Sequence, residues 1–297
     1  MSANGKERAW FALANSAPTQ PKPWLDGTID HLSFNSVRQI RICPEAWRQR
    51  RILNRKERPG EALVLGSAMH RALEFTHRQK ITSFVDLPTL EVVEFFHDAA
   101  WPSALAENEE EGIRWDREGD TDTPRRDGER MLHAYHHTVS PRIQPIAVEQ
   151  RIEFEIPEVP VPFIGFVDVV EQTNAIDLKT SKAVNKRPDS NWRLQGAMYS
   201  GHLRLPTHFH SVSRAQTPGI ATPLESDEMV VNPDPSQWSK ITRILQDYAA
   251  QVEFYFRRYG PEGPWPMNGI FMDYRGGAAC GFCGYRKFCP MWEHERA

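Results

Sequence analysis

Charged side chains stand close together in residues 175–182, AIDLKTSK. Successive side chains of a β-strand point to opposite faces. We therefore expect Asp177 and Lys179 to share one face of a strand, with Ile176 and Leu178 buried on the other. A charged pair on one side of a buried strand is either a solvated edge or a reaction site.

A second strand-like segment, VPFIGFVDVV at 161–170, precedes this one and carries Asp168. The connection 171–174 contains an Asn, a residue typical of turns, so the two segments predict a hairpin. A two-residue turn at Thr173 and Asn174 would place Asp168 opposite Lys179 and on the same face as Asp177. An odd connection would turn Asp168 to the other face unless a bulge corrected the register.

Such a hairpin could hydrolyse phosphodiesters. Two converging carboxylates repel each other, and a hard divalent cation is the usual remedy. Mg²⁺ or Mn²⁺ bound by Asp168 and Asp177 could lower the pKa of a water and neutralise charge on a phosphodiester. Lys179 would orient that water or stabilise the developing charge. A surface hairpin with a salt bridge is the alternative interpretation.

Three further segments offer polar groups to the same place. The helical pattern at 65–77 carries His70, which could face either the core or a metal. Gln195 and Tyr199 lie four residues apart on a predicted helix and could hold a phosphate backbone or Lys179. Glu149, in the alternating segment 147–156, could also reach this face.

The four cysteines form a separate pattern. Three follow the spacing C-x2-C-x5-C near the C-terminus, and the fourth lies in an Arg-rich segment, 38–58; the four are Cys280, Cys283, Cys289 and Cys43. In a chain without a secretory signal this favours a soft-ligand metal site over disulfides. The three-plus-one division favours a [4Fe-4S] cluster, whereas zinc held by the three C-terminal cysteines and His294 is the alternative.

Composition sets the broad class. The 297 residues are 40% hydrophobic and 25% charged with a net charge of -3, as in an ordinary globular protein. No apolar run is long enough for a membrane helix and no leader pattern begins the chain, so we expect a cytoplasmic protein without membrane contact. Residues 1–30 are expected to form a flexible tail, and 31–297 a single domain.

The periodicity predicts an α/β fold with a mixed central sheet flanked by helices and an N-terminal helical cap. Helices are expected at 34–56, 66–79, 88–101, 124–139, 190–203 and 235–258. Strands are expected at 146–156, 161–171, 174–181, 207–215 and 225–231. A cluster joining residue 43 to 280–289 would fasten the cap to a C-terminal iron-sulfur segment. We interpret His208 and His210 as packing or surface residues.

Four short motifs in this order resemble the RecB-like branch of the PD-(D/E)XK nucleases: GSAMHRALE, GFVD, DLKT and QGAMY. The one-plus-three cysteines resemble its iron-sulfur members, the CRISPR-associated exonucleases, the AddB-type recombination nucleases and their phage relatives. The resemblance covers roughly residues 34–291. It implies a restriction-endonuclease-like core. Many relatives have Glu at the position of Asp177.

The resemblance also implies roles for individual residues. His70, Asp168 and Asp177 would be ligands of Mg²⁺ or Mn²⁺, together with the backbone carbonyl of Leu178. Lys179 would be the catalytic lysine. Gln195 and Tyr199 would contact DNA or position the site, and the four cysteines would hold a [4Fe-4S] cluster.

The activity expected from these features is a metal-dependent DNA exonuclease that acts on single strands or DNA ends in recombination, repair or CRISPR adaptation. Its setting would be the cytoplasm of a bacterial, archaeal or phage-infected cell. The protein partner would be a second copy of the chain or a recombination or CRISPR protein. The alternatives are a non-catalytic DNA-binding or assembly subunit and a zinc-stabilised nuclease.

Overall fold

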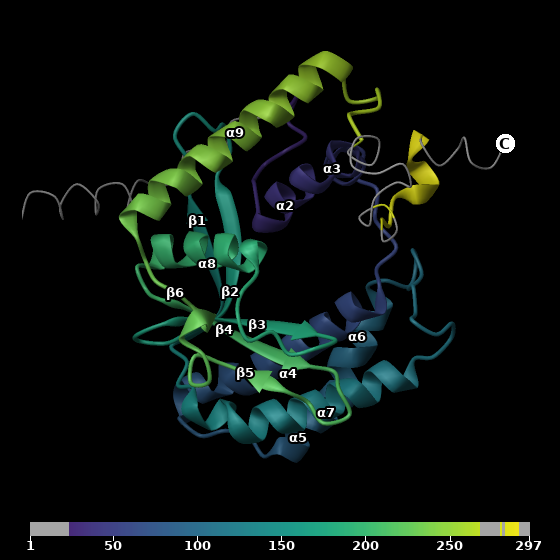
Figure 1. The fold of residues 1–297 in the computed structure, drawn as a ribbon. Helices are drawn as coiled ribbons and strands as arrows, with labels where there is room; N and C mark the ends of the chain where they lie inside the picture. The colour runs from purple at the N-terminus through teal and green to yellow at the C-terminus, as the bar shows by residue number, and fades with distance from the viewer. Residues whose placement is uncertain (1–23, 268–279, 281–282, 291–297) are drawn as a thin grey trace, which may run out of the picture.

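The computed structural model describes residues 24–267, 280 and 283–290 (Figure 1). A mixed sheet runs through these residues in the order β1-β2-β3-β4-β5, and β6 also pairs with β4. Only β3 and β4 are parallel to each other. The strands are β1 (Ala147–Phe154), β2 (Phe163–Val170), β3 (Ala175–Ser181), β4 (Thr207–Ser213), β5 (Ile220–Ala221) and β6 (Val230–Val231).

Helices cover both sides of this sheet, as the sequence predicts. One layer is α4 (Glu61–Ser83), α5 (Thr89–Phe95), the π-helical η1 (Phe96–Ala100), α6 (Trp101–Ala106) and α7 (Asp122–Thr138). The other contains α2 (Phe34–Ile42), α3 (Pro44–Arg51), α8 (Ser190–Leu203) and α9 (Pro235–Tyr259). Three short 3₁₀ turns are η2 (Ser140–Arg142), η3 (Asp227–Met229) and η4 (Arg286–Phe288). In Figure 1 the long β1–β2 hairpin joins the lower layer to the upper one.

The helix expected at 34–56 is wrong as a single element. It divides at Cys43, whose backbone is extended with φ −161° and ψ 111°. Pro44 explains the break, because a proline disfavours the helical conformation of the residue before it and is well suited to the first turn of a new helix. Cys43 therefore lies at the corner between α2 and α3.

Part of the predicted tail belongs to the folded domain. Residues 24–30 form a turn in which Trp24, Leu25 and Ile29 are buried. Trp24 and Ile29 form an isolated β-bridge, and the three side chains pack in the same core cluster as α9. Residues 1–23 of the predicted tail lie outside the described residues.

Two apolar cores lie on opposite sides of the sheet. The first packs β1 and β2 against α2, α8 and α9, and includes Val167. The second packs β3 and β4 against α4 and α7, and includes Val169 and Leu178. Because Val167 and Val169 would share one face of a regular strand, β2 must change faces between them. Asp168 stands at this change.

The predicted register of the hairpin is wrong by two residues. Val169 pairs with Ile176 and Glu171 N–H donates to Asn174 O, so the two-residue turn is Gln172 and Thr173. The loop has the even parity that the sequence analysis required. Extended by one residue beyond the last pair, this register would set Asp168 opposite Asp177, and not opposite Lys179.

The strand expected at 225–231 is also wrong in extent. The chain there forms η3 and the short strand β6, and the short strand β5 forms earlier. The four other strands and the helices at 190–203 and 235–258 match their predicted positions to within about two residues at each end.

Candidate active site

Asp168 occupies a fork in the sheet. The ladder between β2 and β3 ends after Val169 and Ile176, because β2 continues along β1 while β3 continues along β4. Beyond this point the Leu178 N–H donates to Asp168 Oδ2 at 2.6 Å. The Asp168 carboxylate thus accepts the Leu178 N–H in place of a backbone carbonyl of β2, which has diverged from β3 at this point.

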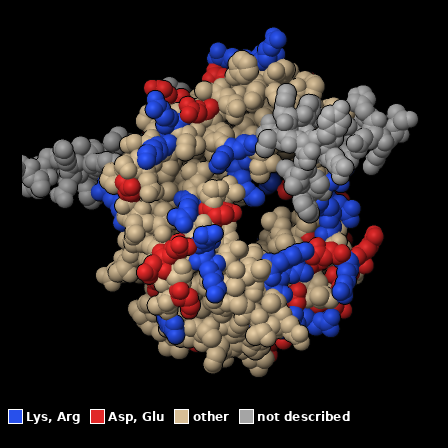
Figure 2. Space-filling view, in the orientation of Figure 1, with Lys and Arg blue, Asp and Glu red and all other residues tan. Residues whose placement is uncertain are grey.

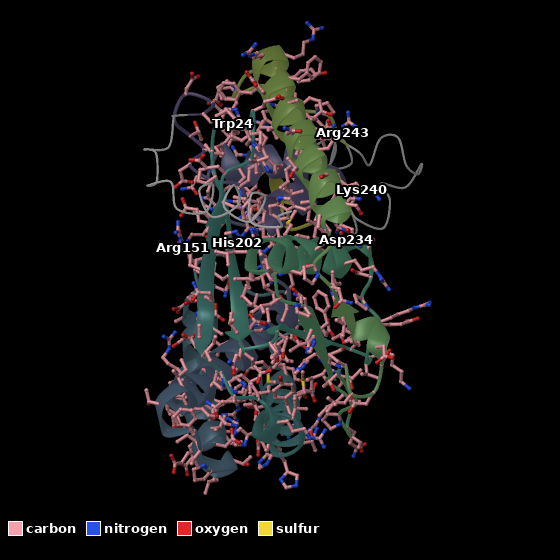
Figure 3. The ribbon with its side chains drawn as sticks, turned by 90° about the vertical axis from the view of Figure 1, so that its left-hand side faces the viewer. Trp24, Arg151, His202, Asp234, Lys240 and Arg243 are labelled. Atoms are coloured by element: carbon pink, nitrogen blue, oxygen red, sulfur yellow. The ribbon has the colours of Figure 1, made fainter. Side chains whose placement is uncertain are left out.

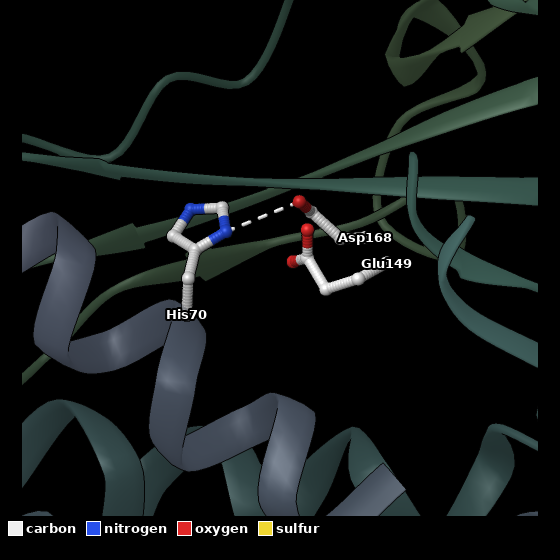
Figure 4. Close-up of side chains that lie close together, drawn as sticks. All are labelled: His70, Glu149 and Asp168. Carbon is white, nitrogen blue, oxygen red and sulfur yellow. Dashed lines mark hydrogen bonds and ion pairs between the residues drawn. The ribbon is translucent and has the colours of Figure 1, made fainter. Parts of the chain in front are cut away.

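Helix α4 brings His70 to this fork. Gly66, one turn earlier, allows the close approach of the helix to β3, since a Cβ atom there would stand 3.3 Å from Thr180 Oγ1. His70 Nδ1 lies 3.1 Å from Asp168 Oδ1 (Figure 4). Burial disfavours the imidazolium, but the Asp168 charge and hydrogen bond, with help from Asp177, outweigh it and raise the pKa of His70 to about 9.

Glu149 is the third member of this group. It lies on β1 at the register position facing Asp168, between the pairs Val148–Val169 and Gln150–Val167. One ligand atom each from His70, Glu149 and Asp168 falls within 4.8 Å of the others (Figure 4). Burial and the neighbouring Asp168 charge raise the pKa of Glu149 to about 7.

Asp177 and Lys179 face the opposite layer, as their spacing predicts. Asp177 is 2% exposed, and one of its oxygens lies 2.5 Å from Lys179 Nζ. Lys179 Nζ also donates to Gln195 Oε1 at 2.9 Å, and Gln195 Nε2 donates to Asp177 Oδ1 at 3.1 Å. Helix α8 therefore closes a three-residue ring over β3.

Tyr199 anchors this ring to β2. Gln195 Nε2 lies 2.8 Å from Tyr199 Oη, which donates to the Phe166 carbonyl at 2.7 Å. The ring of Tyr199 lies over Gly165, where a Cβ atom would stand 3.2 Å from Cε1. The helical pair Gln195 and Tyr199 thus orients Lys179 from behind.

The pKa values of Asp168 and Asp177 are shifted in opposite directions. Burial raises the pKa of both, but His70, Lys179 and the Leu178 N–H outweigh it at Asp168 and hold its pKa below the usual value. At Asp177 burial and the Asp168 charge prevail over Lys179, so its pKa is raised. Removing positive charge from this site would therefore favour a proton on Asp177.

The donors fit a hard divalent cation. Carboxylate oxygens are the ligands preferred by Mg²⁺ and Mn²⁺, and an imidazole accompanies them. The Leu178 N–H points to Asp168, and the N–H and C=O of one strand residue point to the same side of the strand. The Leu178 carbonyl consequently faces the fork, where the sequence analysis expects a ligand.

In the described residues, the side chains of the expected site form two groups of contacts. His70 and Asp168 are in contact, and Asp177 contacts Lys179 and Gln195; only His70, Glu149 and Asp168 converge within 4.8 Å among the residues described. From the sequence, Glu149 was only an additional residue that could reach the site. A register for β1 against β2 would have shown it facing Asp168.

The cysteines gather at a different place, beside α3. The Phe288 carbonyl lies 3.4 Å from Gln49 Nε2, and the Arg55 guanidinium lies 4.4 Å from the Phe288 ring centroid, so η4 contacts α3 and the residues that follow it. Burial raises the pKa of the Cys283 thiol to about 11, and Cys43, Cys289 and Cys280 add to this through their charges.

The spacing of the thiols is wider than that of a closed zinc site. Within the described part of the chain, no three cysteine sulfurs lie within 4.8 Å of one another. Tetrahedral ligands with Zn–S bonds of about 2.3 Å would lie about 3.8 Å apart. His294, the fourth ligand of the zinc alternative, lies outside the described residues.

Much of the Arg-rich segment is engaged within the protein. Arg48 is buried, pairs with Glu45 at 2.6 Å and donates to the Pro261 carbonyl. Arg58 donates to the Ile113 carbonyl, and Lys56 lies 3.2 Å from Glu110. In Figure 2, Lys and Arg side chains are spread among acidic ones over the visible face. Arg48 is thus a structural residue.

The buried histidine of β4 is confirmed as a packing residue. His210 is 5% exposed, and its Nδ1 lies 2.7 Å from Tyr135 Oη.

In the described part of the chain, none of the helices is long and apolar enough to traverse a bilayer.

Comparisons with known proteins place this geometry in a family. The profile of the PD-(D/E)XK nuclease superfamily matches residues 31–290. A search of curated proteins found no match. Among solved structures, a "putative exonuclease" from Eubacterium rectale is similar with a TM-score of 0.49 and 12% identity over 95% of each chain.

The structure of SSO0001 is similar with a TM-score of 0.34 and 10% identity over 80% of this chain and 88% of the other. Both similarities are too low to carry an argument about function. The profile match spans most of the chain, from the start of the domain to the last cysteine-containing segment. The chain therefore belongs to the PD-(D/E)XK nuclease superfamily.

Proposed function

We propose that this protein is a metal-dependent DNA exonuclease that hydrolyses phosphodiester bonds of single strands or DNA ends. The observation that carries the proposal is the convergence at the fork between β2 and β3. There His70 contacts Asp168, the Leu178 N–H donates to Asp168, and the neighbouring Asp177 contacts Lys179. Acidic groups, an imidazole and an ammonium suit a phosphodiester whose charge must be neutralised during attack by water.

In this proposal His70, Asp168, Asp177 and the Leu178 carbonyl hold Mg²⁺ or Mn²⁺. When bound, the cation would lower the pKa of a water and neutralise negative charge on the phosphate. Lys179 has three N–H groups, of which one donates to Gln195 and another points to Asp177. The third can donate to the water or to a phosphate oxygen. Gln195 and Tyr199 keep Lys179 in this orientation.

The decisive experiment is a nuclease assay on DNA labelled at one end, in single-stranded and duplex form, with Mg²⁺, Mn²⁺ or EDTA. We expect a ladder of products that shortens progressively from one end and vanishes in EDTA. Internal cuts from the first time point would contradict exonuclease action. DNA that is bound but never cut would instead favour the non-catalytic subunit.

We further propose that Cys43, Cys280, Cys283 and Cys289 hold a [4Fe-4S] cluster. Their mutual electrostatic influence supports this, and so does the packing of η4 against α3, because both bring distant cysteines into one region. Protein purified without oxygen should be brown and contain about four iron atoms per chain. A colourless protein with one zinc would support the zinc alternative. Cys283→Ser should lose the metal, and the parent from the same preparation is its control.

A further inference from the structure

The Glu149 carboxylate lies beside the acidic side chain of Asp168. Within the described residues, no hydrogen bond or ion pair joins it to another side chain. It nevertheless faces Asp168, with His70 completing a group of ligand atoms within 4.8 Å (Figure 4). Two carboxylates at this separation repel, and a shared cation would remove the repulsion.

The backbone of β1 holds Glu149 in this position. Its φ is +50°, in the left-handed region that non-glycine residues seldom adopt within a strand. Pairs of β1 with β2 on both sides of Glu149 keep the strand in register around it. The unusual conformation thus occurs at the residue that faces Asp168.

A small cavity adjoins these groups. It has a volume of about 20 Å³, and its wall includes His70, Glu149 and Asp168 as well as the buried His77 and Tyr135. A cavity of this size can hold one water-sized species. Space, charge and donor atoms therefore coincide on the α4 side of Asp168.

We propose that Glu149 is a direct ligand of the divalent cation, alongside His70 and Asp168. The inference rests on the proposed function, because it concerns the same metal. It adds a protein ligand from β1 to those of α4, β2 and β3. The cation would then be enclosed by the α4 side of the fork, while Asp177 lies nearer to Lys179.

Titration calorimetry of the full chain with Mn²⁺, without DNA, tests this inference. Glu149→Gln keeps the size of the side chain and removes its charge, so we expect Mn²⁺ to bind about ten-fold more weakly or worse. Glu153→Gln is the matched control, because Glu153 lies on the same strand and pairs with Arg151. It should bind Mn²⁺ as the parent does.

Melting temperatures supply a second test, because the expected effect of Glu149→Gln differs between EDTA and Mn²⁺. In EDTA, Glu149→Gln should melt at or above the parent temperature, because the repulsion from Asp168 is gone. Addition of Mn²⁺ should raise the melting temperature of Glu149→Gln by less than it raises that of the parent. Equal Mn²⁺ affinity in Glu149→Gln and the parent would overturn the ligand role of Glu149 but not the nuclease proposal. A parent that binds no Mn²⁺ would overturn both.

A different observation concerns Phe166. It is 52% exposed although it lies in the central part of β2, two residues before Asp168. Two strand residues place the Cα atoms of Phe166 and Asp168 about 6.6 Å apart. Its register partner on β1 is Arg151, which Figure 3 places at the outer side of that strand.

We infer that Phe166 is a stacking platform for a base of single-stranded DNA whose phosphate lies at the fork. Stacking on the ring would tolerate any base, as exonuclease action needs, and the neighbouring Arg151 can contact the DNA backbone. Tyr199 fixes the Phe166 backbone through its carbonyl and so couples the platform to Gln195. This inference also rests on the proposed function.

Binding of a 2-aminopurine-labelled single strand in EDTA tests the platform without cleavage. Phe166→Leu should weaken binding about five- to 150-fold and reduce the quenching of 2-aminopurine. Phe254→Leu is the control and should behave as the parent, because Phe254 is a similarly exposed phenylalanine on α9. Unchanged binding in Phe166→Leu would refute the platform alone. A parent that binds no single strand would refute the DNA substrate as well.

Discussion

At the scale of single residues, two side chains from different elements hold Lys179 in position. It contacts Asp177 and Gln195, which come from β3 and α8. Lys179→Ala should lower kcat about 10²- to 10³-fold, as loss of one preorganised charge donor does. Lys182→Ala, three residues later and paired with Asp116, is the control. Steady-state kinetics on labelled DNA measure the effect, and a loss confined to KM would contradict it.

A second residue, His77, links stability to pH. It is buried on α4, and burial lowers its pKa to about 4. A histidine with a folded pKa below the unfolded value of about 6.5 contributes its full stability above that value. Its contribution falls as the pH drops toward 4, by about 2 kcal/mol at pH 5.

His77→Met removes this titration while keeping an apolar side chain. Its free energy of unfolding should therefore fall less than that of the parent between pH 7.5 and pH 5. Urea unfolding at the two pH values measures the difference. Parallel losses in the two proteins would mean that His77 is not the group that titrates.

At the scale of elements, the approach of α8 to the sheet positions Gln195. Gly196 lies against β4, and a Cβ atom there would stand 2.8 Å from the ring of Phe209. Alanine is favoured over glycine inside a helix by about 1 kcal/mol, but overpacking of a core typically costs about 1–3 kcal/mol. The clash should prevail and move α8 outward.

We therefore expect Gly196→Ala to lower both the melting temperature and kcat, because Gln195 moves with the helix. Phe209→Leu in the same chain should restore part of both by making room. Thermal melting and the DNA assay measure the two effects. A Gly196→Ala protein more stable than the parent would show that propensity outweighs the contact.

At the scale of the whole molecule, Glu45 connects α3 to the segment after α9. It is 1% exposed, pairs with Arg48 and accepts the Trp265 N–H at 2.7 Å. Trp47 and Trp265 stack beside it with centroids 5.6 Å apart. Residues more than 200 positions apart are thus joined by ordinary protein contacts close to Cys43.

Removing Glu45 would leave Arg48 as an uncompensated buried charge. Glu45→Ala should lower the free energy of unfolding by about 3–5 kcal/mol, and Glu45→Ala with Arg48→Met should recover part of the loss. Urea denaturation measures both, with Glu57→Ala as the control, because Glu57 lies nearby in the sequence and is only half-buried. A double variant no more stable than the single one would contradict the charge explanation.

The sequence alone determined the order of elements and the types of chemical group. Period-two and period-3.6 patterns are local, so they located β1 to β4, α8 and α9 and put Asp177 and Lys179 on one face. The turn residues located the hairpin, but they left the parity of its connection open. The break at Cys43 could have been found too, because Pro44 is a local signal.

Only the tertiary structure decided which groups meet. The turn at Gln172 and Thr173 removed Asp168 from its predicted position opposite Lys179, and the register of β1 added Glu149. The buried ion pair of Arg48 with Glu45 likewise exists only in the folded chain. The physical reason is that strand register and ion pairing depend on contacts between distant segments, which no local periodicity encodes.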